Sequence, residues 1–350
     1  MQIQDLETPV AVVDLDRLQA NIRRLQTYLD LHGLANRPHI KTHKIPEIAH
    51  MQLEAGATGI TCQKLGEAEI MVAAGIREIF LPYNLLGPAK LERLMHLTRR
   101  ARIRVTADAE TVVQGYAEAA RAEGTVLPVL VEFDTGTGRC GVQSPQEAAD
   151  LAQTIAGHRS LHFAGLMTYP FNDQTGEFVA ATRRLLEAQG LPLETVSIGG
   201  TPAMWQAHTV SGATEHRAGT YVYGDRNTVL AGAMTLEACA FHIRTTVVSR
   251  PTPERAILDA GSKVLSSDPA RGGSGYGQLL EYPDAVLYNL SEEHGWVDVS
   301  RCDPRPQIGE VVTVLPNHVC VVTNLLNQVV GHRRGEVEVV WPVLARGMVQ

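Results

Sequence analysis

Short apolar runs and amphipathic stretches follow one another regularly along the first 230 residues of the chain. Each apolar run has the length of a strand, and a polar or glycine-containing turn separates it from a stretch with apolar residues at helical spacing. The runs that predict strands are Arg37–Lys41, Gly59–Gln63, Ile79–Asn84, Ile103–Ala107, Val126–Phe133, Leu161–Tyr169, Val196–Gly200 and His216–Tyr221. The stretches that predict helices begin near Ile45, Leu65, Pro88, Ala109, Pro145, Gly176 and Pro202.

This alternation predicts a closed (β/α)8 barrel over residues 1–230. A doubly wound open sheet has the same local pattern, and it is the alternative that the sequence leaves open. One further apolar segment, from Pro9 to Leu15, precedes the regular alternation. This first strand could pair with either part of the molecule.

The alternation ends near Val229, and the remaining chain shows strand patterns without helical periodicity. Turns rich in glycine, proline, aspartate and asparagine separate these strands. The expected strands are Cys239–Val248, Arg255–Asp259, Gly295–Val299, Val311–Val314, Val329–Val330 and Val337–Val340. We therefore expect an α/β fold in which a TIM-type barrel is followed by a smaller all-β domain over residues 231–350.

Charge and cysteine content restrict the classes of function. The chain has 31 basic and 38 acidic residues, and its net charge of −7 argues against nucleic acid or an anionic membrane as a partner. Its five cysteines are widely spaced and odd in number, which fits a reducing cytoplasm better than a disulfide framework. We recognise no signal peptide, and no apolar run approaches the ~20 residues of a membrane span. We therefore expect a cytoplasmic protein.

A lysine between two histidines ends the first predicted barrel strand, in Arg37-Pro38-His39-Ile40-Lys41-Thr42-His43-Lys44. The carboxyl ends of the strands carry the chemistry in such barrels. If this segment is a strand, His39, Lys41 and His43 lie on one face. A lysine amine in such surroundings is a nucleophile toward carbonyl groups. The alternative is a basic edge strand with solvated side chains.

Two glycine turns follow the seventh and eighth predicted strands, Gly199-Gly200-Thr201 and Gly219-Thr220-Tyr221. Exposed N–H groups and the dipole of the helix expected after the first turn suit a phosphate, which these loops often bind in such barrels. The alternative is an ordinary tight turn with an N-cap. With Lys41, both turns fit one ligand that has a phosphate at one end and a carbonyl at the other.

Further polar residues stand at the predicted strand ends: Gln63, Tyr83, Asn84, Asp108, Glu132, Asp134, Arg139, Cys140, Thr168 and Tyr169. One loop among them, Gly136–Gly141, matches the G-x-G-x-x-G motif of dinucleotide-binding folds. That motif belongs after the first strand, with an acidic residue at the end of the next one. Here it follows the fifth strand, so NAD binding is the weaker interpretation.

His318 and Cys320 form a candidate metal pair in the predicted β domain. Residues i and i+2 of a strand lie on one face, so imidazole and thiolate could reach one cation. This pair suits Zn²⁺ or another borderline divalent metal, and it leaves coordination positions open for water and substrate. The alternative is a core cysteine beside a surface histidine.

Together these motifs resemble those of the D-threonine aldolase and D-serine dehydratase family, along nearly the whole chain. The resemblance rests on Asp5–Pro9, Arg37–Lys44, Pro46–Ala49, Thr61–Lys64, Asp134–Val142, Gly199–Thr201, Ala218–Tyr221, Leu258–Gly261, Glu293–Gly295 and Pro316–Cys320. It implies a fold-type III, alanine-racemase-like barrel that binds pyridoxal 5'-phosphate (PLP), followed by a β domain that carries a metal.

The resemblance also implies roles for single residues. Lys41 resembles the lysine that carries PLP, Arg139 the group that faces its pyridine nitrogen, and Tyr169 a residue beside the ring or substrate. The implied cofactor-binding set is Lys41, Gln63, Arg139, Tyr169, Gly199, Gly200, Thr201, Gly219, Thr220 and Tyr221. His318 and Cys320 resemble the metal ligands, with zinc, manganese or magnesium as the metal. Because they share the predicted face of Lys41, His39 and His43 are candidate proton-transfer groups.

The implied substrate is a D-3-hydroxy amino acid, for which two lyase reactions are open. Retro-aldol cleavage gives glycine and an aldehyde, whereas dehydration gives a 2-oxo acid and ammonia. Cys320 favours dehydration, since the family's aldolases carry His-x-Asp at the metal site and its dehydratases His-x-Cys. The segment Pro170–Asp173 lacks the histidine-bearing loop of the aldolases and does not match the dehydratases either. We rank retro-aldol cleavage first, because the overall pattern lies nearer to the bacterial aldolases.

Two other functions are weaker interpretations. A PLP-binding protein without turnover can have such a barrel, but the small proteins of this kind lack the β domain. An amino-acid racemase would need a catalytic tyrosine from the β domain of a partner subunit, for which Tyr276 or Tyr282 could be proposed. Enzymes of this fold usually complete each active site at a dimer interface, so the resemblance implies a homodimer.

Overall fold

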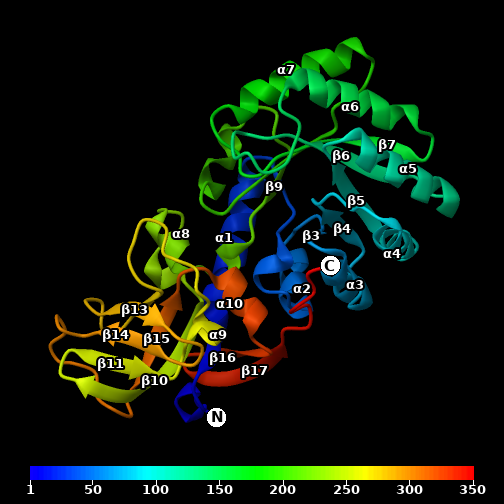
Figure 1. The fold of residues 1–350 in the computed structure, drawn as a ribbon. Helices are drawn as coiled ribbons and strands as arrows, with labels where there is room; N and C mark the ends of the chain where they lie inside the picture. Colours follow the sequence, from blue (N-terminus) through cyan, green and yellow to red (C-terminus); the bar gives the residue numbers. More distant parts are fainter. The chain divides into compact units, whose positions relative to one another are not determined.

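The computed structural model describes all 350 residues, and the chain forms two compact units (Figure 1). The barrel unit comprises Leu25–Lys41, Pro46–Gly219 and Met348–Gln350. The β unit comprises Met1–Arg24, Thr42–Ile45 and Thr220–Gly347. The predicted division into separate domains between residues 230 and 231 stays a prediction. None of the helices combines the length and the apolar character that a membrane span requires.

Eight parallel strands form the sheet of the barrel unit. They are β2 (Ala35–Asn36), β3 (Ile60–Thr61), β4 (Glu78–Leu81), β5 (Arg102–Ala107), β6 (Leu127–Glu132), β7 (Leu161–Met167), β8 (Thr195–Gly199) and β9 (Glu215–Arg217). From β3 to β9, each strand pairs with the next one along the chain, and β2 pairs with β9. This order is expected when a crossover returns the chain to the same end of the sheet after every strand.

The sheet closes through the residues that follow β2. His39 forms a parallel bridge with Thr61, whose N–H group donates to the Pro38 carbonyl at 2.8 Å. On the other side, the His39 N–H group donates to the Ala218 carbonyl at 2.8 Å. The extended segment therefore pairs with both ends of the strand order. The prediction of a TIM-type barrel, rather than an open doubly wound sheet, is confirmed.

Helices cover the outside of this sheet, as Figure 1 shows for α4 to α7. The helices of the barrel part are α1 (Leu15–Leu31), α2 (Pro46–Glu54), α3 (Leu65–Ala73), α4 (Pro88–Thr98), α5 (Glu110–Glu123), α6 (Pro145–Gly157) and α7 (Thr175–Ala188). Three of them begin with proline. Proline lacks a backbone N–H group, but the first residue of a helix has no acceptor within the helix for that group, so no hydrogen bond is lost. The helix expected from Pro202 is instead a short 3-10 helix, η3 (Met204–Thr209).

A nine-stranded sheet dominates the β unit. Its strands are β1 (Val10–Asp14), β10 (Phe241–Thr252), β11 (Arg255–Leu258), β12 (Gly277–Leu279), β13 (Val286–Leu290), β14 (Gly295–Asp298), β15 (Val311–Pro316), β16 (Gln328–Arg333) and β17 (Glu336–Pro342). β1 lies between β10, with which it is antiparallel, and β16, with which it is parallel. The first strand of the chain therefore belongs to the β sheet and not to the barrel.

Two short helices, α9 (Ser262–Leu265) and α10 (Val319–Leu325), interrupt the part that the sequence predicted to be all-β, and α8 (Arg226–Leu230) lies just before it. The expectation that helices are absent is wrong at these places, because so few residues do not show a helical period. The short strands β12 and β13 were also not predicted. This part of the chain nevertheless consists mostly of strands, so the smaller β domain is confirmed.

Candidate active site

The lysine-bearing segment leaves the sheet earlier than its sequence predicted. Strand pairing ends at His39, and Ile40–Thr42 form a 3-10 turn, η2. The prediction that His39, Lys41 and His43 share one strand face is therefore wrong. A 3-10 helix has three residues per turn, so residues i and i+2 point in different directions.

Lys41 lies at the carboxyl edge of the barrel sheet, beside Tyr169. Its Nζ atom is 5.6 Å from the centre of the Tyr169 ring, and the guanidinium carbon of Arg139 is 5.1 Å from the same centre. Lys41 follows β2, Arg139 lies in the loop after β6, and Tyr169 follows β7. Cations are attracted to the face of an aromatic ring. The fold thus brings three predicted site residues together around one ring, which is 39% exposed.

His39 and Gln63 support the turn that carries Lys41. The Nδ1 atom of His39 accepts the N–H group of Lys41 at 3.3 Å, and its Nε2 atom lies 3.0 Å from Oε1 of Gln63. These two contacts place the ring proton on Nε2, which donates to Gln63. His43 is fully buried, and its Nδ1 atom accepts the N–H group of Ile45 at 3.1 Å. Both histidines therefore shape the segment, and their role in proton transfer stays a prediction.

Two carboxyl groups complete this edge of the barrel. Asp108 accepts hydrogen bonds from Nδ2 of Asn84 at 2.5 Å and from the Gly141 N–H group at 2.9 Å. Glu132 is buried, and its carboxylate lies 3.6 Å from Nη2 of Arg139. Burial raises the pKa of Glu132 to about 7, although Arg139 opposes the shift. The sequence placed Glu132 at a strand end but did not show that its carboxyl group titrates near neutral pH, as proton donors and acceptors often do.

The turn after β8 differs from its prediction in one respect. Gly200 has φ +126°, a conformation that other residues rarely adopt, so the turn requires glycine. The Gly200 N–H group donates to the Arg217 carbonyl at 3.3 Å, and the Thr201 side chain is buried. The expected helix dipole is absent, because only the short η3 follows, from Met204. An anion at this turn must therefore be bound by amide and hydroxyl groups alone.

The second predicted phosphate turn, Gly219-Thr220-Tyr221, follows β9 directly. Thr220–Val222 form a 3-10 turn, η4, and the Thr220 carbonyl accepts the N–H groups of Tyr223 at 3.1 Å and of Gly224 at 2.8 Å. The Tyr221 side chain is almost completely buried. The turn is therefore rigidly held, as a phosphate-binding loop requires.

Backbone N–H groups of the G-x-G-x-x-G loop donate hydrogen bonds to nearby aspartate side chains. Asp134 accepts the N–H groups of Thr137 and Gly138, each at 3.0 Å, and Asp108 accepts that of Gly141. These amides are engaged within the protein. The loop therefore does not form the phosphate cradle of a dinucleotide-binding motif.

Arg217 is a buried residue at this edge that the sequence did not single out. Its Nη1 atom donates to Oγ of Ser197 at 2.5 Å, and its Nη2 atom donates to the Thr168 carbonyl at 2.9 Å. It thus ties the carboxyl ends of β7 and β8 to β9. Its position two residues before Gly219 was the available signal, since alternate residues of that strand face the barrel interior.

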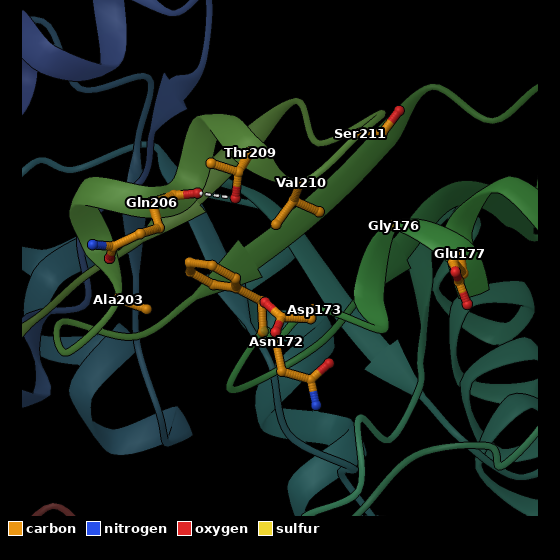
Figure 2. Close-up of a pocket in the computed structure, with 10 residues that line it drawn as sticks. Asn172, Asp173, Gly176, Glu177, Ala203, Gln206, Thr209, Val210 and Ser211 are labelled. Atoms are coloured by element: carbon orange, nitrogen blue, oxygen red, sulfur yellow. Dashed lines mark hydrogen bonds between the residues drawn. The ribbon is translucent and has the colours of Figure 1, made fainter.

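The segment after Tyr169 that departs from the family pattern lines a cavity of about 740 Å³ (Figure 2). The cavity lies between the start of α7 and η3, and Asn172, Asp173, Glu177, Gln206, Thr209 and Ser211 supply its polar lining. It has two carboxylates and no basic side chain. An anionic group would therefore find no positively charged partner there.

The candidate metal pair lies in the β unit at the start of a helix and not on a strand. β15 ends at Pro316, His318 is the N-cap residue of α10, and Cys320 lies in the first helical turn. The prediction that His318 and Cys320 lie on one face of a strand is therefore wrong. The two side chains nevertheless form a hydrogen bond with each other. The extended backbone of His318 at the N-cap is compatible with this close approach.

Asp225 and Thr42 position this pair. Nδ1 of His318 lies 3.5 Å from the Asp225 carboxylate, which also accepts the N–H groups of Val319 at 3.1 Å and of Thr228 at 2.8 Å. Asp225 and Cys320 raise the pKa of His318 to about 10. Sγ of Cys320 lies 3.1 Å from the hydroxyl group of Thr42. Asp225 was not predicted, although an aspartate three residues before a threonine is a helix-start signal.

The residues of the two candidate sites fit the groups that the sequence implied. The barrel edge offers an amine, an aromatic ring and a permanently charged guanidinium group, in Lys41, Tyr169 and Arg139. His318 and Cys320 offer nitrogen and sulfur ligands, which suit a borderline divalent cation. No group of three or more histidine, cysteine, aspartate or glutamate residues in the chain could hold a metal ion, so this pair would need further ligands from water or substrate.

A barrel of eight parallel strands with a lysine at its carboxyl edge, joined to a β domain, defines an alanine-racemase-like protein. Residues 13–227 match the family described as "Alanine racemase, N-terminal domain". Residues 240–332 match the family described as "Putative serine dehydratase domain". Alanine racemase of Clostridium difficile 630 shares the fold, with a TM-score of 0.69 and 15% identity over 97% of this chain and 99% of that one.

Relatives define the family more narrowly. The D-threonine aldolase of an Arthrobacter species is 36% identical over 98% of this chain and 93% of its own. The D-threo-3-hydroxyaspartate dehydratase of a Delftia species is 33% identical over 90% and 91%. The crystal structure of D-threonine aldolase from Filomicrobium marinum has a TM-score of 0.90 and 31% identity over 99% of this chain and 97% of that one. The chain therefore belongs to the D-threonine aldolase and D-serine dehydratase family of fold-type III PLP enzymes, and the predicted lyase class is confirmed.

Proposed function

We propose that this chain is a PLP- and divalent-metal-dependent lyase that cleaves D-3-hydroxy amino acids to glycine and an aldehyde. The observation that carries the proposal is the group of Lys41, Tyr169 and Arg139 at the carboxyl edge of the barrel. The aldolases among the relatives support it, since D-threonine aldolase and 3-hydroxy-D-aspartate aldolase match nearly the whole chain.

Residues of the barrel edge would hold the cofactor. PLP, when bound, withdraws electrons from the substrate carbon that carries the amino group. Lys41 would bind its aldehyde carbon, and Arg139 would face its ring nitrogen and keep it unprotonated, because guanidinium does not readily give up a proton. Tyr169 would pack beside the ring. The glycine turns Gly199–Thr201 and Gly219–Tyr221 would bind its phosphate.

His318 and Cys320 would hold the divalent metal. A divalent metal supplies Lewis acidity, which assists either loss of a hydroxyl proton or loss of the hydroxyl group itself. Asp225 orients the imidazole through Nδ1, so that Nε2 would be the nitrogen that holds the cation. The metal-free form of a mutant D-threo-3-hydroxyaspartate dehydratase, at 30% identity and a TM-score of 0.87, supports a metal in this family.

Dehydration to a 2-oxo acid and ammonia is the second candidate. Cys320 favours it, since the resemblance implies His-x-Cys at the metal site of dehydratases and His-x-Asp in aldolases, and this chain has His318 and Cys320. The D-threo-3-hydroxyaspartate dehydratase and the D-serine dehydratase among the relatives also favour it. Both reactions use the same set of Lys41 and metal residues, so only the products distinguish them.

Product analysis decides between the two reactions. Purified enzyme is incubated with D-threonine and with D-serine, each with PLP and a divalent metal. Glycine and an aldehyde as products support the aldolase, whereas a 2-oxo acid and ammonia support the dehydratase. Conversion of D-amino acids to their L-enantiomers, with neither product set, would contradict the lyase proposal.

The racemase alternative has a specific weakness in this structure. The hydroxyl group of Tyr282 donates to Glu310 at 2.5 Å, and burial raises the pKa of this tyrosine to about 12. A hydroxyl group held in this way is a poor catalytic base. A homodimer in the cytoplasm, with zinc, manganese or magnesium as the metal, stays a prediction.

A further inference from the structure

A cavity of about 650 Å³ opens at the other end of the barrel, where the strands begin. Its walls include the first residues of β5, β6, β7 and β8, together with Arg37 after β2. Because the strands are parallel, this end lies opposite to the edge that carries Lys41 and Tyr169. In barrels of this kind the amino-terminal end normally serves stability, so a polar cavity there requires an explanation.

Two arginines that line the cavity share one carboxylate. Nε of Arg37 donates to Oε2 of Glu215 at 2.6 Å, and Nη2 of Arg104 donates to the same oxygen at 2.7 Å. Glu215 is buried, and its other oxygen accepts the Ser197 hydroxyl group at 2.6 Å. Two guanidinium groups thus share one carboxylate, so these three side chains together carry one net positive charge.

The terminal nitrogens of Arg37 have no protein acceptor. Only its Nε atom donates a hydrogen bond to the protein, yet its side chain is only 8% exposed. A side chain at Gly59 would collide with Nη1 of Arg37, so glycine makes room for the guanidinium group there. The remaining N–H groups of Arg37 are therefore available to an acceptor that enters the cavity.

Other acidic residues at the cavity do not supply this acceptor. Glu78 forms an ion pair with Arg102 at the mouth of the cavity. Glu194 lies 3.6 Å from the ring of His162, and both side chains are about half exposed. Glu78 therefore has its own cationic partner, and Glu194 lies beside an imidazole, both near solvent. Glu78 acts on Arg37 only through a longer-range attraction, and Arg37 forms its ion pair with Glu215.

We propose that the cavity is a binding site for a small anion that carries carboxylate or phosphate groups. A guanidinium group presents its N–H donors in a planar fork, which matches the two oxygens of a carboxylate or a phosphate. Arg37 and Arg104 both bond one oxygen of Glu215, so their forks converge on the same part of the cavity. The site does not depend on the reaction at the opposite end of the barrel.

Calorimetric titration of the PLP-loaded enzyme with malonate and with inorganic phosphate tests this site. We expect at least one anion to bind, and the tighter one identifies the group that the site prefers. Arg104→Lys keeps the charge but removes the fork, and it should weaken that binding about tenfold or more. Arg93→Lys is the matched control, because this arginine forms a two-point ion pair with Glu69, does not line the cavity and should leave the affinity unchanged.

Absence of binding by both anions would overturn the proposal, and so would equal losses in Arg104→Lys and Arg93→Lys. Arg104 also contacts the ring of the buried Phe80 at 5.4 Å, so its variant could fold poorly. Thr195→Glu provides a second test, because it places a carboxylate in the cavity wall. We expect this variant to bind the anion at least about tenfold more weakly. Wild-type affinity in a folded Thr195→Glu variant would contradict the site.

Discussion

Lys41 is the residue on which the proposed cofactor chemistry depends, and Lys44 provides its control. Lys41→Ala should abolish the visible absorption band of bound PLP, because no other amine would replace it beside Tyr169. Lys44→Gln should retain the band, since Nζ of Lys44 points to the Ala345 carbonyl in the β unit. Absorption spectra of both variants with added PLP provide the measurement. A yellow Lys41→Ala enzyme would contradict the assignment.

Asp225 can be tested separately from the two residues that it supports. Asp225→Asn should lower the metal affinity by roughly 10- to 100-fold, because the amide no longer fixes the imidazole of His318 as a carboxylate does. Thr228→Ala is the control, since it disturbs the same helix cap without touching His318. Metal content after dialysis against metal buffers provides the measurement. Equal losses in the two variants would indicate a general effect on folding.

Glu132 makes the stability of the chain depend on pH. The folded state raises its pKa to about 7, so this carboxyl group binds a proton more tightly in the folded than in the unfolded chain. Its contribution is complete at low pH and is lost as pH rises from about 4.5 to 7. Relative to wild type, Glu132→Gln should therefore gain on the order of 2 to 3 kcal/mol between pH 4.5 and pH 8. Urea unfolding at both values tests this, and a constant difference would contradict it.

At the scale of single elements, β7 and β8 approach each other closely at Gly165. This glycine has φ +129°, and an added Cβ atom would collide with the Thr195 carbonyl. Gly165→Ala should therefore destabilise the barrel by about 3 kcal/mol. Gly124→Ala is the control, because Gly124 has φ +75° with no neighbour near its Cβ position and should lose only about 1 kcal/mol. Thermal unfolding measures both, and equal losses would show that crowding at β8 is unimportant.

Most elements could be predicted from the sequence, because their apolar residues recur often enough to define a helical or strand period. The strands β5, β6 and β7 and the helices α3 to α7 lie close to their predicted positions. The exceptions include two short segments at the candidate sites, η2 at Lys41 and α10 at His318. Three to seven residues carry no period, and tertiary contacts decide their conformation. The sequence therefore indicated which polar residues lie near the strand ends, but not the local geometry by which they meet.

At the scale of the whole molecule, metal and cofactor should be separable. Thorough chelation should abolish lyase activity but leave PLP bound, because the proposed metal ligands His318 and Cys320 are not the lysine that carries the cofactor. Assays and absorption spectra before and after chelation measure the two properties. Re-addition of zinc, manganese or magnesium then identifies the ion that restores activity. Full activity after chelation would contradict the metal assignment.

The sequence predicted the fold class of the whole molecule, but not which distant segments pair with one another. Eight repeats of strand and helix indicated the barrel, and the family motifs indicated the β domain. No local pattern showed that Val12 and Val13 of β1 pair with strands more than 200 residues away. Such long-range pairing depends on the register of the partner strands, which a single apolar run does not encode.

The position of β1 has a consequence for how this protein can be divided and how it could have evolved. The chain passes five times from one compact unit to the other, and β1 has sheet partners on both of its sides. A fragment that starts at residue 231 would lack this strand, and its β10 and β16 would each have an unpaired edge. The barrel and the β domain therefore cannot be exchanged between enzymes by a single crossover of their genes. New substrate preferences in this lineage should arise by changes within both parts rather than by shuffling of either.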